Sequence, residues 1–165
     1  MRPPQISLDL IQALPMVYRA AVPEHYRDLM GHMNIRYYLE IYDEAGIPLF
    51  ERIGLSEAHY RANQAGGFDL EHHIHYLNEV HIGDEVLLYA RLLDRSAKRL
   101  HYMLFMVNQT RGLLASTFEC VNSYADLRVR RTAPYPPAIA AQIDSLLDEH
   151  TRLAWAAPTC GSMSS

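Results

Sequence analysis

The sequence predicts an α+β fold with one long helix, an antiparallel sheet and a second helix at the C-terminal end. Two observations carry this prediction. Between residues 35 and 53 the apolar side chains recur every three or four positions, which is typical of one face of a helix. Four later runs, at 68–77, 85–94, 99–109 and 113–124, have strand-like composition and short connections. We expect them to form a four-stranded meander of hairpins.

Length and composition indicate one soluble domain. The chain has 165 residues, 49% of them hydrophobic and 21% charged, with a formal net charge of −4. These values are near the average for globular domains, so we expect a single domain over 1–155. The last segment, 156–165, consists mainly of small residues that offer little to bury, and we expect it to be a flexible tail.

Several classes of protein are excluded by the same inspection. No stretch of 18 apolar residues is present, and the first residues lack the pattern of a secretory leader, so we expect neither a membrane span nor secretion. The mixed charges predict no basic face for a nucleic acid. Cys120 and Cys160 share no zinc-ligand spacing and suit a reducing, cytoplasmic location.

The remaining elements are justified in chain order. Residues 16–22 form a short apolar run that predicts a strand, and Pro23 ends it. Asn34 is a good N-cap for the long helix, Pro48 predicts a kink in it, and Gly54 ends it. The spacing of apolar residues over 139–150 predicts the C-terminal helix. Since one long helix cannot cover the whole sheet, we expect a second subunit to cover the rest.

The segment before the long helix, Asp28-Leu29-Met30-Gly31-His32-Met33-Asn34, carries the candidate chemistry. A helix N-terminus offers unsatisfied N–H groups that can stabilise an oxyanion, and Ile35 would supply one. Gly31 would let the backbone turn tightly and let a substrate approach closely. The turn could then bring the carboxylate of Asp28 to the same carbonyl group. An Asp-x-x-Gly turn before a capped helix is also a common structural feature, so the pattern alone leaves both roles open.

The segment DLMGHMNIRYYLEIYDEA resembles the signature of the 4-hydroxybenzoyl-CoA thioesterase branch of the hotdog superfamily. The resemblance continues through residues 73–84, and the KRLHYMLFM, GLLAST and APYPPAI segments are most similar to a subgroup with betainyl-CoA thioesterases and the thioesterase-like part of some carnitine dehydrogenases. It covers roughly residues 17–142. It implies a hotdog fold, thioester hydrolysis and assembly as a homodimer or a dimer of dimers.

The resemblance also implies roles for individual residues. Asp28 would be the catalytic carboxylate, acting as a nucleophile or as a general base, and the Ile35 N–H would be the oxyanion donor. His32 is a further catalytic candidate, since it could orient Asp28 or contact the thioester. The expected substrate-binding residues are Gly31, Asn34, Tyr38, Glu71, His73 and Arg99.

No metal or separate cofactor is expected, because coenzyme A enters as part of the substrate. His73 and His75 lie on one strand face, but a His-x-His pair without two further ligands is incomplete as a zinc site. The phosphates of coenzyme A call for basic residues. Either of two clusters, around 95–99 or around 128–131, could supply them.

Two other functions remain open from the sequence. A hotdog enoyl-thioester hydratase or dehydratase would use a His with a carboxylate, as His32 and Asp28 could provide. A non-catalytic module that binds acyl-CoA would keep the fold without the reaction. The acyl group is also open: Tyr37, Tyr38, Tyr42 and Tyr76 could hold a quaternary ammonium group or could be ordinary core residues.

Overall fold

The computed structural model describes residues 6–165, which form two compact units. Unit 1 consists of residues 6–48, 74–90 and 104–118, and unit 2 of residues 49–73, 91–103 and 119–165. Residues 1–5 of the predicted domain lie outside the described part. Each unit is described below by itself.

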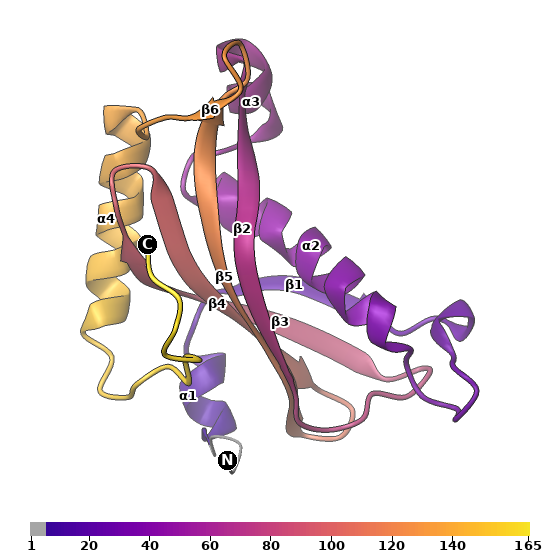
Figure 1. The fold of residues 1–165 in the computed structure, drawn as a ribbon. Coiled ribbons are helices and arrows are strands. Elements are labelled where there is room, and N and C mark those ends of the chain that lie inside the picture. The colour runs from indigo at the N-terminus through magenta and orange to yellow at the C-terminus, as the bar shows by residue number, and fades with distance from the viewer. Residues whose placement is uncertain (1–5) are drawn as a thin grey trace. The chain divides into compact units, whose positions relative to one another are not determined.

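The predicted α+β class is confirmed: the described chain contains a six-stranded sheet together with helices. The elements, labelled in Figure 1, are α1 (Leu8–Gln12), β1 (Met16–Ala21), the 3-10 helix η1 (Glu24–Tyr26), α2 (Ile35–Arg52), α3 (Glu57–Asn63), β2 (Ala65–Tyr76), β3 (Glu85–Arg95), β4 (Arg99–Asn108), β5 (Leu113–Asp126), β6 (Arg131–Thr132) and α4 (Pro137–Thr151). Sequence periodicity located the long helix and the main strands to within a few residues. It missed the short elements α1, η1, α3 and β6, which have too few residues to establish a period.

The predicted four-stranded meander is wrong in one pairing. The sheet order is β1-β3-β4-β5-β2, so β3, β4 and β5 form a meander while β2 pairs with β5 instead of β3. The connection after β2 is held by β5, because the N–H groups of Leu77 and Asn78 both donate to the Ala115 carbonyl. The place beside β3 is taken by β1, in antiparallel register with Ala20 opposite Val86.

In unit 1 the first part of α2 packs against β5. The Tyr42 hydroxyl lies 2.6 Å from the Ser116 hydroxyl, and the Tyr42 ring stacks on Phe118 with centroids 4.8 Å apart. Tyr42 is only 1% exposed. The helix runs from Ile35 to Arg52 with Pro48 inside it, so Pro48 does not end it. These contacts fix the rotation of α2 about its axis, and therefore the direction of its first turn.

Unit 2 is built around contacts of α4 and of the loop after α2. The His150 Nδ1 atom accepts a 2.9 Å hydrogen bond from the Leu92 N–H of β3, and the Arg95 guanidinium pairs with Asp144. Gly54 has a φ of +84°, and a Cβ atom there would lie 2.8 Å from Ile139 Cδ1. Gly54 therefore ends the long helix as predicted and also allows close packing against α4.

The segment after α4 makes contacts within unit 2. The Arg91 guanidinium lies over the Trp155 ring, 4.2 Å from its centroid, and the Cys160 N–H donates to the buried Glu119 carboxylate at 2.6 Å. The Oε1 atom of Glu119 also lies 2.9 Å from the His101 Nε2 atom. Both cysteines of the chain are free thiols. In the described residues, no helix combines the length and the apolarity needed to cross a membrane.

Candidate active site

A hollow of about 410 Å³ in unit 1 lies at the N-terminal end of α2. Its lining comes from the loop before the helix, from the first turns of α2 and from the segment that ends β2. The lining residues are Asp28, Met30, His32, Met33, Asn34, Ile35, Tyr38, Tyr76, Leu77, Asn78 and Glu79. Six of the residues that the sequence singled out are therefore brought together here, namely Asp28, His32, Asn34, Ile35, Tyr38 and Tyr76.

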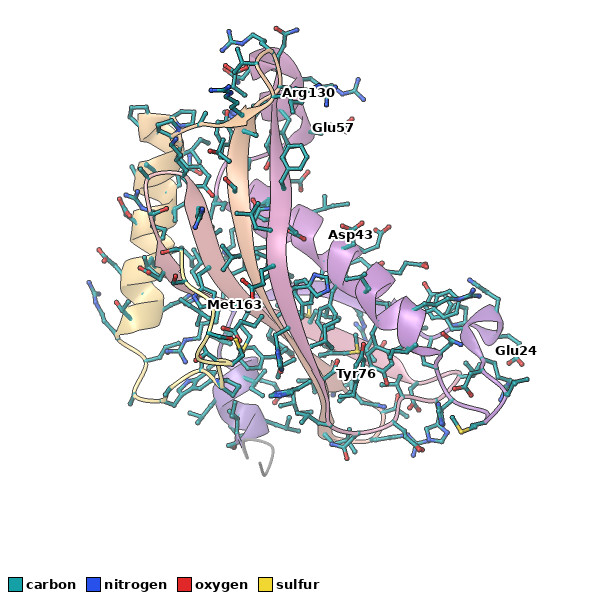
Figure 2. All side chains as sticks on the ribbon, in the orientation of Figure 1. Glu24, Asp43, Glu57, Tyr76, Arg130 and Met163 are labelled. Carbon is teal, nitrogen blue, oxygen red and sulfur yellow. The ribbon has the colours of Figure 1, made fainter. Side chains whose placement is uncertain are left out.

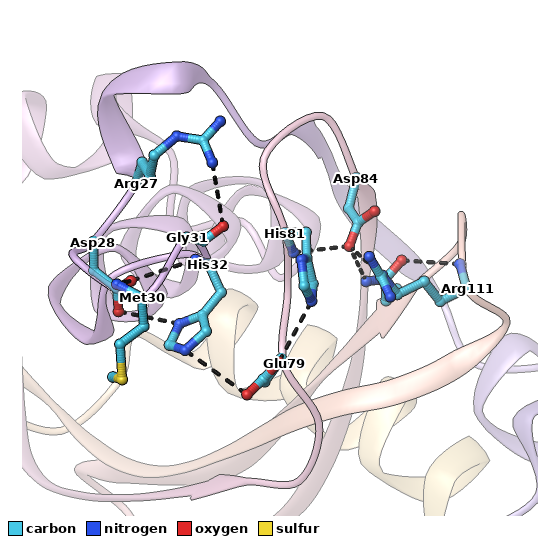
Figure 3. Close-up of polar contacts among 10 residues, drawn as sticks. Arg27, Asp28, Met30, Gly31, His32, Glu79, His81, Asp84 and Arg111 are labelled. Carbon is cyan, nitrogen blue, oxygen red and sulfur yellow. Dashed lines mark hydrogen bonds and ion pairs between the residues drawn. The ribbon is translucent and has the colours of Figure 1, made fainter.

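The loop before α2 turns around the carboxylate of Asp28. Its Oδ1 atom accepts hydrogen bonds from the N–H groups of Met30 at 2.7 Å and His32 at 3.3 Å (Figure 3). Gly31 has a φ of +92° inside this turn, although nothing lies within 4 Å of the position of an added Cβ atom. The glycine is thus required by backbone conformation and not by lack of space.

The loop is also tied to the rest of unit 1 through its backbone. The Met33 N–H donates to the Val80 carbonyl at 2.7 Å, and the Asn34 N–H donates to the Tyr26 carbonyl at 2.8 Å. These bonds hold both ends of the turn, so the Asp28 side chain has a defined position at the hollow. Its side chain is 16% exposed.

The carboxyl group of Asp28 has a pKa below its ordinary value. Partial burial acts to raise this pKa, but the hydrogen bonds from the Met30 and His32 N–H groups, with the nearby imidazole of His32, outweigh that effect. Asp28 is therefore a carboxylate at neutral pH. The backbone donors occupy Oδ1, so the Oδ2 atom keeps lone pairs that can face a substrate or water.

His32 lies between two carboxylates. Its Nδ1 atom is 3.1 Å from Asp28 Oδ2, and its Nε2 atom is 3.7 Å from Glu79 Oε1 (Figure 3). The ring is mostly buried, with 21% of the side chain exposed. His32 thus contacts the Asp28 oxygen to which the backbone N–H groups do not bond.

The start of α2 provides the expected hydrogen-bond donor. The Asn34 Oδ1 atom accepts from the Arg36 N–H at 3.2 Å, so Asn34 caps the helix. Ile35 is the first helical residue, and its N–H has no intrahelical acceptor. Both residues line the hollow together with Asp28. The positive end of the helix dipole would also stabilise a negative charge on an oxygen atom bound near Ile35.

The opposite wall is aromatic. The rings of Tyr38, on α2, and Tyr76, at the end of β2 (labelled in Figure 2), meet edge to face with centroids 5.0 Å apart. Burial, reinforced by the charges of Glu79 and Asp28, raises the pKa of the Tyr38 hydroxyl to about 12, so it stays protonated. Of the four tyrosines considered from the sequence, these two line the hollow. Tyr42 is a core residue, and Tyr37 stacks on Tyr26 at 3.8 Å instead.

Four expected binding residues do not belong to this lining: Gly31 lies in the turn between Met30 and His32, and the other three lie in unit 2. Glu71 and His73 are exposed residues of β2, and Arg99 is an exposed residue of β4, all in unit 2. Their roles stay predictions. In the neighbouring basic clusters Arg95 pairs with Asp144 and Arg128 with Asp126. Among residues 6–165 no group of three or more His, Cys, Asp or Glu is arranged to hold a metal ion.

The sequence analysis missed the wall formed by Leu77, Asn78 and Glu79. The Asn78 amide donates to the Leu114 carbonyl at 2.8 Å, which fixes this segment against β5. In the sequence, a polar pair between two strands resembles an ordinary turn, and its place beside the Asp28 loop follows from long-range bonds to Ala115 of β5 and from Val80 to Met33. The arrangement as a whole places a carboxylate, an imidazole and a free helix N–H around one hollow, which suits attack on a carbonyl group.

The fold and this site define a class, the hotdog proteins that act on thioesters. The family model of the thioesterase-like superfamily matches residues 22–143, so the chain belongs to that superfamily. The match includes both the Asp28 loop and the Leu77–Glu79 wall. The predicted hotdog fold and the predicted family are confirmed.

Relatives and solved structures agree with this assignment. The chain is 29% identical to the betainyl-CoA thioesterase of Pseudomonas aeruginosa, over 82% of this chain and 86% of that protein. It is 32% identical to the L-carnitine dehydrogenase/betainyl-CoA thioesterase of Agrobacterium fabrum, over 79% of this chain and 26% of that one. The chain thus spans less than a third of the bifunctional relatives that it matches. A Staphylococcus aureus protein solved with coenzyme A superposes with a TM-score of 0.79 at 25% identity, covering 87% of this chain and 90% of that one.

Proposed function

We propose that the protein is an acyl-CoA thioesterase that hydrolyses a small acyl-CoA thioester to the free acid and coenzyme A. The observation that carries the proposal is the shared hollow of Asp28 and Ile35, a carboxylate and a free helix N–H that can act on one carbonyl. The membership of the chain in the thioesterase-like superfamily and its similarity to betainyl-CoA thioesterases support it.

The chemistry requires attack on the carbonyl carbon and stabilisation of the resulting oxyanion. Asp28 Oδ2 either attacks the carbon itself or removes a proton from a water that attacks it, and each route forms a tetrahedral oxyanion. The Ile35 N–H donates to the oxyanion, a contribution of about 3 kcal/mol to the transition state. The oxyanion then collapses and the C–S bond breaks, which gives the free acid after attack by water, or an anhydride with Asp28 that water hydrolyses. A thiol has a pKa of about 8.5, so the thiolate leaves without a strong acid and takes up its proton from solvent.

For the acyl group we propose a small chain with a quaternary ammonium, as in betainyl-CoA. The Tyr38 and Tyr76 rings form one wall of the hollow, and the carboxylates of Asp28 and Glu79 also line it. Aromatic faces with nearby negative charge attract a desolvated cation. The names of the relatives agree with this substrate.

The remaining parts of the proposal concern partners and location. Coenzyme A enters with the substrate, so no separate cofactor is required, and we assign its phosphates to basic surface residues such as Arg99. We also propose that the chain forms a homodimer or a dimer of dimers in the cytoplasm. β2 supports self-association because it is a 12-residue edge strand with exposed Phe68 and Leu70.

A panel of acyl-CoA thioesters, assayed for release of free thiol, tests the function. Betainyl-CoA and short neutral acyl-CoAs are expected to release thiol at rates that are saturable in substrate. Addition of water to an enoyl-CoA without thiol release would identify a hydratase instead. Binding of acyl-CoA with no turnover of any panel member would identify a non-catalytic module.

A further inference from the structure

Glu79 lies between two imidazole rings at the edge of the hollow. Its Oε1 atom is 3.7 Å from His32 Nε2, and its Oε2 atom is 3.5 Å from His81 Nε2 (Figure 3). The two rings are arranged edge to face with centroids 6.4 Å apart. One carboxylate therefore faces both rings, one through each of its oxygens.

The backbone fixes Glu79 relative to the catalytic loop. His32 and His81 form an isolated antiparallel bridge, and the Met33 N–H donates to the Val80 carbonyl. The segment that contains Glu79 is thus paired directly with the segment that contains His32. A substitution of Glu79 would therefore affect Asp28 through the His32 ring, whose contact with Glu79 is held in place by the backbone.

A buried carboxylate holds the far end of the same segment. The Oδ2 atom of Asp84 accepts hydrogen bonds from the His81 N–H at 2.8 Å, the Asn108 amide at 2.7 Å and the Arg111 Nε at 2.9 Å. These donors hold the pKa of Asp84 below its ordinary value, although burial acts to raise it. Asp84 therefore stays charged and keeps His81 and Glu79 in place.

The two carboxylates act on opposite edges of one ring. Asp28 faces Nδ1 of His32 and Glu79 faces Nε2. Carboxylates only accept hydrogen bonds, so each ring nitrogen that carries a proton has an acceptor on its own side. Rotation of the ring by half a turn about the Cβ–Cγ bond would lose the contact with Asp28, and attraction between Nε2 and Glu79 opposes that rotation.

We propose that Glu79 is a positioning residue: its carboxylate orients the His32 ring so that Nδ1 faces the catalytic carboxylate of Asp28. The inference rests on the proposed function, because it assumes that Asp28 performs the reaction. Glu79 itself does not touch the reacting atoms. Its side chain is 66% exposed, so solvent weakens the attraction and the expected effect on rate is modest.

The first test is Glu79→Gln, which keeps the size of the side chain and removes its charge. With a short neutral acyl-CoA as substrate, which has no positive charge for Glu79 to attract, we expect kcat for thiol release to fall about fivefold, with KM within about twofold and the melting temperature unchanged. Glu57→Gln is the matched control, because Glu57 is an exposed glutamate of unit 2 that pairs with Arg61. Wild-type kcat in the Glu79→Gln protein would overturn the inference.

A double-mutant cycle separates positioning from a general structural effect. If Glu79 acts through His32, Glu79→Gln should have no further effect on kcat in a His32→Gln protein. An equal fall in both backgrounds would mean that Glu79 acts independently of His32, against the inference.

A nuclear magnetic resonance readout keeps the test independent of activity. The ¹⁵N signals of the His32 ring, which report where its protons lie, should change in Glu79→Gln and stay constant in Glu57→Gln. Unchanged His32 signals in Glu79→Gln would overturn the positioning role. A wild-type protein that releases no thiol from any panel member would overturn the proposed function instead, and the ring signals would still decide the role of Glu79.

Discussion

Asp28 and His32 face each other across one turn of the loop before α2, with Asp28 Oδ2 3.1 Å from His32 Nδ1. Both residues belong to the same seven-residue segment, so the contact is local. Two N–H groups of this segment bind the other oxygen of Asp28. The loop therefore both orients the carboxylate and keeps it ionised.

Replacement of Asp28 by Asn should abolish most of the activity. We expect kcat for thiol release to fall by at least about 100-fold, because the amide can neither attack nor remove a proton. The amide oxygen can still accept from the Met30 N–H, so the melting temperature should stay close to that of the wild type. Asp43→Asn, at an exposed position of α2, is the control. Near wild-type turnover of Asp28→Asn would remove Asp28 from the mechanism.

Substrate preference can be tested with a matched pair of thioesters. Betainyl-CoA and 3,3-dimethylbutyryl-CoA differ by a positive nitrogen in place of a carbon. A desolvated cation–π contact of about 2 kcal/mol predicts a kcat/KM roughly thirtyfold higher for betainyl-CoA. Tyr76→Leu should reduce this ratio, whereas Tyr37→Leu, outside the hollow, should leave it unchanged. Equal values for the two substrates would contradict a cation-selective hollow.

Stability should fall between pH 6.5 and pH 4 because of His150. Burial, with the nearby charges of Arg91 and Arg52, lowers the pKa of His150 to about 4 in the folded protein. The unfolded chain has the ordinary value of about 6.5, so it binds a proton first as the pH falls and becomes favoured. The effect is about 3 kcal/mol, present in full above pH 6.5 and lost progressively down to pH 4.

Denaturant titrations at several pH values measure this effect. His150→Gln, which removes the titrating group, should flatten the dependence of the unfolding free energy on pH in that window. His72→Gln, an exposed position on β2, is the control. If the unfolding free energy of the His150→Gln protein depends on pH as steeply as that of the wild type, His150 is not the source of this dependence.

Self-association through β2 should be visible in solution. Analytical ultracentrifugation is expected to give a mass at least twice the 18.9 kDa of the chain. Phe68→Lys combined with Leu70→Lys should weaken the association, because both exposed side chains lie on one face of this edge strand. Val129→Lys, in the turn after β5, should not. A stable monomer at micromolar concentration would contradict the proposed assembly.

The sequence allowed the turn at Asp28 and the start of α2 to be predicted because their interactions are local. The Asn34 cap and the Asp28 turn each join residues within four positions. Glu79 could not be predicted, since its contact with His32 depends on a pairing of segments nearly 50 residues apart, with His32 bridged to His81 and the Met33 N–H bonded to the Val80 carbonyl. Tyr38 and Tyr42 share a helix face, but the sequence does not distinguish the one that lines the hollow from the one bonded to Ser116.

The placement of β2 beside β5 also has a consequence for how the protein is synthesised. The wall formed by Leu77 and Asn78 is held by hydrogen bonds to the carbonyls of Leu114 and Ala115. These two residues leave the ribosome well after the Asp28 loop. The loop can adopt its turn early, but the hollow has no second wall until β5 is translated. Because distant contacts form slowly, we expect the hollow to be completed late, after the β3-β4-β5 hairpins have formed. A nascent chain that ends before residue 113 would carry Asp28 without the second wall of the hollow.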